Sequence, residues 1–184
     1  MSRFSLTALI RGHFKSLRDR RYSPSRFSWT TVALLYGLPL AVGATFHSSP
    51  DAMLKAPAVI LTALALLAGA FLTSFTHIST LRMKLTERTG DHEDTELPDR
   101  NLTDEAATHL LMGAFSSIAT AVVLVVCINF QSTNCLIGVP AAIVCTLCTW
   151  VALILLMAVP RLYDAYLVVN KVPDAMSGSF KGEK

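Results

Sequence analysis

Charged side chains are scarce in this sequence, and four long segments lack them altogether. Asp, Glu, Lys and Arg make up 16% of the 184 residues, against about 25% in an average soluble domain. None of these four residue types occurs in segments 29–47, 56–78, 106–130 and 139–159. Each segment is long enough for a helix to cross the hydrocarbon core of a bilayer, which takes about 20 apolar residues. The shortage of charge therefore excludes a soluble globular protein and a disordered chain.

The sequence also lacks the residues that most membrane chemistry requires. Four cysteines in 184 residues are too few for a disulfide-dense secreted fold. The apolar segments contain no carboxylate, and proton-coupled transporters need one inside the membrane. There is no phosphate-binding glycine loop, no Ser-His-Asp set and no zinc-ligand spacing. We therefore predict a protein that is not an enzyme and has no cofactor and no metal site.

The four apolar segments predict an all-α fold, a four-helix transmembrane bundle within residues 29–172. Of the 16 Lys and Arg residues, seven precede the first span, four lie in the connection 79–105 and four follow the last span. One lies in the connection 48–55, and none lies in 131–138. Because basic flanks stay on the cytoplasmic side, we expect both termini and the connection 79–105 in the cytoplasm.

Residues 1–28 form a basic leader in which we predict an interfacial amphipathic helix. The apolar residues Leu6, Ile10, Phe14 and Leu17 recur at helical spacing. This stripe is expected either at the lipid headgroup boundary or against the cytoplasmic ends of the other helices. Basic residues near it suit the anionic inner leaflet of the bilayer: Arg11, Lys15, Arg18, Arg20 and Arg21.

The connection 79–105 is acidic, with eight Asp or Glu residues against four Lys or Arg. The second span is predicted to continue as helix beyond residue 78, and Thr103 is predicted to cap the next helix, which leaves a loop at 90–102. We expect this connection to dock a cytosolic protein with a basic surface, the alternative being a solvated linker. The tail 173–184 is expected to be disordered. The candidate docking residues are Glu87, Asp91, Glu93, Asp94, Glu96 and Asp99.

Small residues and one proline predict how the helices bend and pack. Gly37 and Pro39 predict a kink in the first span, because proline removes a backbone hydrogen bond and clashes with the preceding turn. Helices in lipid associate where small residues let their backbones approach. We therefore expect packing or oligomer contacts at residues spaced four apart in the second and third spans: Ala65, Gly69, Thr73, Gly113, Ser117 and Ala121.

The cysteines and histidines leave a redox alternative open. Cys145 and Cys148 form a C-x-x-C pattern in the fourth span, as in one family of four-span quinone-linked disulfide enzymes. Those enzymes also need a cysteine pair in an outer loop, and here the outer connections contain Cys135 alone. A quinone-linked thiol oxidoreductase is thus the alternative function. His77 and His109, expected at matched depth, are interpreted as interfacial side chains rather than haem ligands.

In size, topology and lack of catalytic residues, the chain resembles the small four-span proteins of bacterial anti-phage defence islands. Examples are the membrane subunit of Kiwa-type systems and membrane-depolarising effectors. This resemblance covers most of the chain and concerns its architecture. It implies a homo-oligomer in the bacterial inner membrane that anchors a cytosolic partner or opens an ion-conducting pore, without contacting nucleic acid. A phage-encoded pore or superinfection-exclusion protein would have the same physical properties and is a further alternative.

Overall fold

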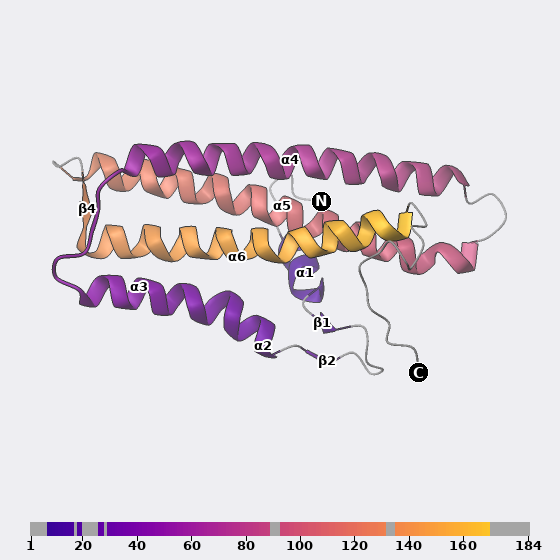
Figure 1. Cartoon of the computed structure of the whole chain (residues 1–184), viewed down its shortest axis with the longest axis horizontal. Helices are drawn as coiled ribbons and strands as arrows, with labels where there is room; N and C mark the ends of the chain where they lie inside the picture. The colour runs from indigo at the N-terminus through magenta and orange to yellow at the C-terminus, as the bar shows by residue number, and fades with distance from the viewer. Residues whose placement is uncertain are drawn as a thin grey trace.

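The computed structural model is all-α and is built on three long helices (Figure 1). It describes residues 7–16, 18–19, 26–27, 29–88, 93–131 and 135–169, without the side chains at 8, 15–16, 18–19, 26–27, 84–88, 93–101 and 168–169. The long helices are α4 (Pro57–Arg88), α5 (Glu93–Asn129) and α6 (Gly138–Val169). The first apolar segment forms a fourth helical rod in three consecutive pieces: α2 (Trp29–Val32), η1 (Ala33–Gly37) and α3 (Leu38–Ser48).

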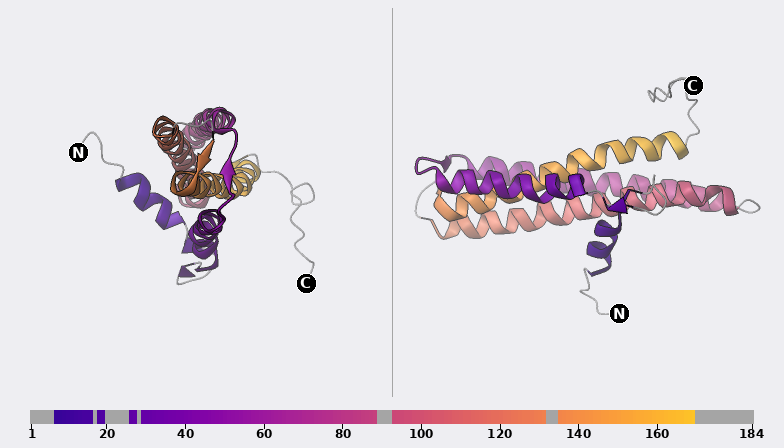
Figure 2. Two further views of the ribbon diagram at one scale, coloured as in Figure 1. Left: turned by 90° about the vertical axis from the view of Figure 1, so that its left-hand side faces the viewer. Right: turned by 90° about the horizontal axis from the view of Figure 1, so that it is seen from below.

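The four rods run along one axis (Figures 1 and 2). Helix α5 packs against both α4 and α6, and α3 packs against α6 at the edge of the assembly. A short N-terminal helix, α1 (Thr7–Ser16), lies crosswise to this axis and contacts α5. Between α1 and α2, the strands β1 (Arg18–Asp19) and β2 (Arg26–Phe27) pair antiparallel.

All four rods are long and apolar enough to cross a membrane. The apolar stretches are Trp29–Ser48, Pro57–Met83, Leu102–Asn129 and Gly138–Leu167, and each overlaps one of the charge-free segments. At most 39% of the most apolar window in any of them is buried inside the chain. Leu66 on α4 and Leu156 on α6 are 71% and 68% exposed. Apolar side chains that point outward over whole helices require an apolar solvent, so this is the surface of a multi-pass membrane protein.

The interior between the rods is apolar as well. Leu110 and Leu124 of α5 and Val144, Val151 and Ile154 of α6 are at most 1% exposed. Since lipid is as apolar as this core, their burial does little to hold the helices together, and close packing matters more.

Helix α5 begins eleven residues earlier than the sequence predicts, at Glu93 rather than at Asp104 after a cap at Thr103. Thr103 is fully buried inside the helix. The sequence around the observed start offers the acidic residues Glu93, Asp94 and Glu96, which suit the positive end of the helix dipole. Helix α4 continues to Arg88 and α6 runs through Pro160 to Val169.

A π-helical turn precedes the proline of the first span. Pro39 lacks the N–H that the carbonyl of Leu35 would otherwise accept, and its ring crowds that carbonyl. The turn η1, Ala33–Gly37, widens the helix directly before this position, and Leu38 donates its N–H to the Leu34 carbonyl. The helix thus absorbs Pro39 by local widening.

A short ladder that the sequence reasoning missed joins the two connections at the end of the assembly away from α1. Strand β3 (Met53–Leu54) pairs antiparallel with β4 (Leu136–Ile137), so that Met53 lies opposite Ile137. The Gln131 side chain donates to the Ile137 carbonyl at 3.1 Å and accepts from the Ile137 N–H at 3.2 Å. Gly138 starts α6 at a φ of 65°, a conformation that favours glycine.

We predict that Gly43→Ala destabilises the fold while Gly37→Ala does not. A Cβ at Gly43 would overlap the Thr146 hydroxyl and come within 3.3 Å of the Ala142 carbonyl oxygen, so α3 would have to move away from α6. We expect a loss of about 1–3 kcal/mol, as for overpacked cores. Gly37 has helical backbone angles and no neighbour within 4 Å of a new Cβ, so its replacement should cost nothing.

Denaturant unfolding in detergent micelles, followed by circular dichroism, measures both variants. Equal midpoints for the two would mean that the contact of α3 with α6 does not depend on the close approach at Gly43.

Candidate functional site

Polar and titratable side chains gather where α1 crosses the bundle. We name this contact the α1 dock and define it by Leu9, Gly12 and His13 of α1 and Thr108 and His109 of α5. A Cβ at Gly12 would lie 3.1 Å from Thr108 Cγ2, so glycine lets the two helices approach closely. Figure 2 shows α1 running outward from this contact, across the bundle axis.

Two histidines form the centre of the α1 dock. The rings of His13 and His109 lie edge to face, with centroids 5.2 Å apart and planes at 83°. Both side chains are fully buried. Two neutral imidazoles fit this arrangement, because a positive charge on either one would be removed from water.

Ion pairs surround the histidines. Arg161 of α6 is paired with Glu105 of α5, whose side chain is 11% exposed. The second pair involves Asp104, which directly precedes Glu105 on α5. Arg82 of α4 donates from Nε to Asp104 Oδ1 at 3.0 Å, and this pair is more exposed than the pair of Arg161 with Glu105. Burial, and to a smaller extent the positive charge of Arg161, lower the pKa of His13 to about 4. His13 is therefore neutral at pH 7.

An aromatic ladder continues from α1 toward the bundle interior. Phe14 stacks on Tyr36 of η1, with centroids 6.1 Å apart and planes at 12°. The ring centroids of Tyr36 and Trp150 of α6 are 6.3 Å apart. Residues next to each other in α1 thus contact two different parts of the bundle, His13 on α5 and Phe14 on η1.

The apolar stripe predicted for the leader helix contacts the bundle only in part. Leu9, Gly12 and His13 face the bundle, whereas Ile10 and Phe14 are 41% and 44% exposed. Phe14 nevertheless stacks on Tyr36, so the described part of the stripe has one residue at the bundle and one turned away from it. Arg11 is exposed. Leu6, Leu17, Arg20 and Arg21 lie outside the described residues, as do the side chains of Lys15 and Arg18.

The α1 dock and the far end of α5 are separated by about the length of one membrane span. His109 lies 20 residues before the end of α5 at Asn129. At about 1.5 Å per residue this is roughly 30 Å, the thickness of the hydrocarbon core.

The predicted packing residues fall into two sets. On α5, Gly113 and Ser117 are buried, and a Cβ at Gly113 would lie 2.7 Å from the Phe71 ring of α4. Ala121 is half-buried. On α4, the three residues of the set all face outward, and a Cβ at Gly69 would have no neighbour within 4 Å; they are Ala65, Gly69 and Thr73.

The structure describes few side chains of the acidic segment that is predicted to dock a partner. Asp91 is not among the described residues, and for the other candidates only the helical backbone is described. Glu87 lies in the last turn of α4. The other described candidates belong to the first turns of α5: Glu93, Asp94, Glu96 and Asp99.

Cys145 and Cys148 lie three residues apart on α6, whereas His77 and His109 lie in different surroundings. The side chains of Cys127, Cys135, Cys145 and Cys148 are half-buried. His77 is exposed on α4, whereas His109 is buried under α1. Within the described ranges, no three His, Cys, Asp or Glu side chains are grouped so that they could hold a metal ion.

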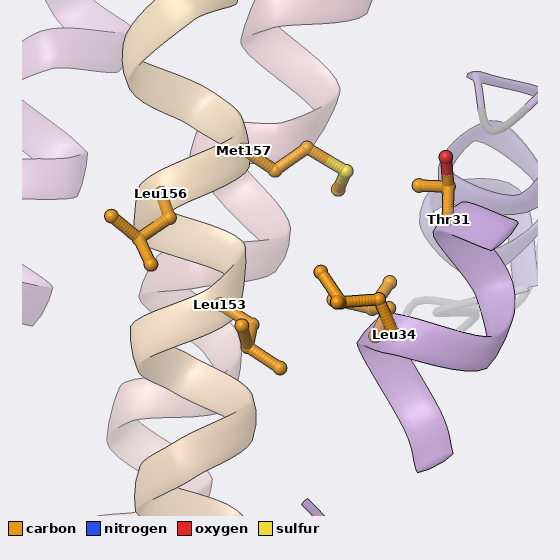
Figure 3. Close-up of a pocket in the computed structure, with 6 residues that line it drawn as sticks. Thr31, Leu34, Leu153, Leu156 and Met157 are labelled. Carbon is orange, nitrogen blue, oxygen red and sulfur yellow. The ribbon is translucent and has the colours of Figure 1, made fainter. Parts of the chain in front are cut away.

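An apolar groove lies between the first span and α6 (Figure 3). Its volume is about 180 Å³. Leu34 points from the first span toward Leu153 and Met157 of α6, and Thr31 supplies a hydroxyl at one end. The complete lining is Thr31, Leu34, Leu35, Leu153, Leu156 and Met157.

Comparisons with protein-family models, with curated proteins and with solved structures give no match.

Sequence reasoning missed His13, the central residue of the α1 dock. It considered the histidines of the apolar segments and read α1 through its leucine, isoleucine and phenylalanine stripe. The usable signal was Leu9 and His13 at a spacing of four with Gly12 between them, which is a second, narrow face of the same helix.

We predict that Glu105→Gln lowers stability more than Asp104→Asn. Without the Glu105 carboxylate, the Arg161 charge stays half-buried beside the histidines, and we expect a cost of about 1–2 kcal/mol. Asp104 belongs to the exposed pair, for which about 0–1 kcal/mol is typical. Thermal unfolding at pH 7.5 compares the two single-charge variants, and equal shifts in melting temperature would contradict the difference in burial.

Proposed function

We propose that this chain is a non-enzymatic membrane protein that assembles into a homo-oligomer and anchors a cytosolic partner beneath the inner membrane of a bacterium. The partner would bind the helix ends beyond the bilayer, around the acidic connection 79–105. The assignment to an anti-phage defence system rests on the resemblance in size, topology and absence of catalytic residues. The proposal for assembly rests on a single feature of α4.

That feature is the outward face of α4, which consists of small and hydroxyl-bearing residues. The threonine hydroxyls donate to carbonyls of their own helix at 2.9–3.1 Å, so none of them needs water. Such a face lets a second backbone approach closely, which is how helices associate in lipid. At 100° per residue the face lies opposite the buried side of α4, which carries Leu64 and Phe71. Its members are Thr62, Ala65, Gly69, Thr73, Thr76 and Thr80.

The packing inside one chain favours an anchor over a pore through that chain. The buried hydroxyls of Ser116, Ser117 and Thr120 donate to carbonyls of α5 itself, at 2.7–2.8 Å. Ions would find no polar lining among the buried leucine, valine and isoleucine side chains of the core. If the oligomer conducts ions, the path runs between copies, along faces such as the outward side of α4.

The orientation in this proposal follows the distribution of Lys and Arg. The α1 end of the bundle faces the cytoplasm, where the basic leader meets anionic lipid headgroups. The ladder of β3 with β4 faces the opposite side. Arg11, exposed beside Ile10 and Phe14, is then positioned for both headgroup charge and the boundary of the acyl chains.

Gly69→Leu should disperse the oligomer in mild detergent. The leucine would project from the outward face of α4 and prevent close approach of a second copy, while meeting nothing in its own chain. We expect light scattering behind size exclusion to give the monomer mass for this variant. Ala70→Leu is the matched control, because Ala70 is also exposed but lies about 100° further round the helix. An oligomer unchanged by Gly69→Leu, or dispersed equally by both, contradicts the proposed contact.

The proposed topology puts residues 1 and 184 on the same, cytoplasmic side. Single cysteines at Ser49 and at the two termini, in a chain without native cysteines, should be labelled differently by a membrane-impermeant maleimide on intact spheroplasts. Only the cysteine at 49 should react, because it lies in the connection between α3 and β3. Labelling of either terminus before lysis would overturn the orientation and, with it, the docking of a cytosolic partner.

A further inference from the structure

The α1 dock joins a short helix to the bundle through two buried histidines, which are side chains that can gain a proton. Helix α1 is ten residues long, lies crosswise to the bundle and meets α5 through a face of three residues. An isolated helix of this length is marginal in water, so its place depends on its contacts. At the middle of those contacts, His13 and His109 are fully buried against each other.

The groups that face His13 make protonation costly while α1 is in place. The His109 ring of α5 faces the His13 ring, with centroids 5.2 Å apart, and the positive charge of Arg161 on α6 acts on His13 as well. Glu105 is an acidic residue one turn before His109 on α5, and its carboxylate is already paired with Arg161. From η1 comes the Tyr36 ring, which stacks on the neighbouring Phe14 and is neutral at the pH values concerned.

We propose that α1 is a pH-sensitive latch, which rests on α5 while His13 and His109 are neutral and leaves α5 when they are protonated. Two imidazolium rings at this separation would repel each other and the Arg161 guanidinium in a place that water does not reach. Release moves His13 to the interface, where its charge is solvated. The inference concerns a single chain and does not depend on the proposed oligomer.

The direction and range of the response follow from His13. Its pKa is lowered to about 4 in the docked state from an ordinary 6.5, so the docked state binds fewer protons than the released state. Docking is therefore fully favourable above pH 6.5 and weakens as pH falls toward 4. By linkage, the contribution of His13 alone should lower the ratio of docked to released chains about 30-fold between pH 7.5 and pH 5, and about 150-fold by pH 4.

Pulsed electron spin resonance on the full chain in phosphatidylcholine nanodiscs tests the latch. The native cysteines are replaced by alanine, and spin labels are placed at Arg11→Cys on α1 and Leu156→Cys on α6, both exposed positions. We expect one narrow distance at pH 8 and a growing second, broader population as the pH is lowered to 4. A distance distribution that stays constant over this range overturns the proposal. A second pair, Met83→Cys with Leu156→Cys, must stay constant, because the bundle itself is not expected to open.

Variants identify the titrating residues. The double variant His13→Gln with His109→Gln should keep α1 docked at every pH, whereas His77→Gln, which alters an exposed histidine on α4, should behave as the native chain. An unchanged response of the double variant overturns the proposal. If that variant is already released at pH 8, His109→Gln alone decides: removing one of the two charges must move the midpoint of release to lower pH, and an unchanged midpoint overturns the proposal.

A reversible tether connects the distance change to this contact. Gly12→Cys with Thr108→Cys should form a disulfide, because a Cβ at Gly12 lies 3.1 Å from Thr108 Cγ2. Oxidised chains should show no second population at pH 4, and reduction should restore it. Release that persists in the oxidised chains would mean that another part of the protein moves, and it would contradict the latch.

Discussion

Close approach of backbones, rather than burial of apolar area, determines where the helices of this protein meet. In lipid, a leucine gains little by leaving acyl chains for another leucine, so contact depends on dispersion between surfaces that fit. Three glycines mark the places where this fit is tightest. Gly43 meets Thr146 between α3 and α6, Gly113 meets Phe71 between α5 and α4, and Gly12 meets Thr108 between α1 and α5.

The same solvent divides the polar groups of the chain into two kinds. Hydroxyls inside the apolar layer, such as that of Ser117, donate to carbonyls of their own helix and require no partner elsewhere. The charged pairs Arg82 with Asp104 and Arg161 with Glu105 lie near the ends of the apolar stretches. The hydroxyls along α5 carry no charge, so the described groups that can respond to pH or salt include these pairs and the histidines of the α1 dock.

The four apolar segments were predictable from the sequence because a long segment without charged residues indicates an apolar surrounding. Which residues of these helices contact one another could not be predicted in the same way. Gly69 and Gly113 have the same signal, a small residue at a spacing of four, yet one faces outward and the other lies under Phe71. Thr103 has the sequence features of a cap but is buried in mid-helix, because local capping preferences are weaker than continuation of a packed helix. His13 was missed since an apolar stripe marks the docking face only when water is the solvent.

Helix α5 connects the α1 dock to α4, the helix whose outward face we propose as the contact between copies. His109 contacts α1, and Gly113, one turn further along α5, contacts Phe71 on the inner side of α4. The outward face of α4 is on the other side of the same helix, so any shift of α5 that follows release of α1 acts on α4 through the Phe71 ring. Because Gly113 leaves this ring no room for even one added carbon, α4 must move with α5 rather than slide past it. Coupling between a pH-dependent latch and a contact between copies would therefore run through two adjacent turns of α5.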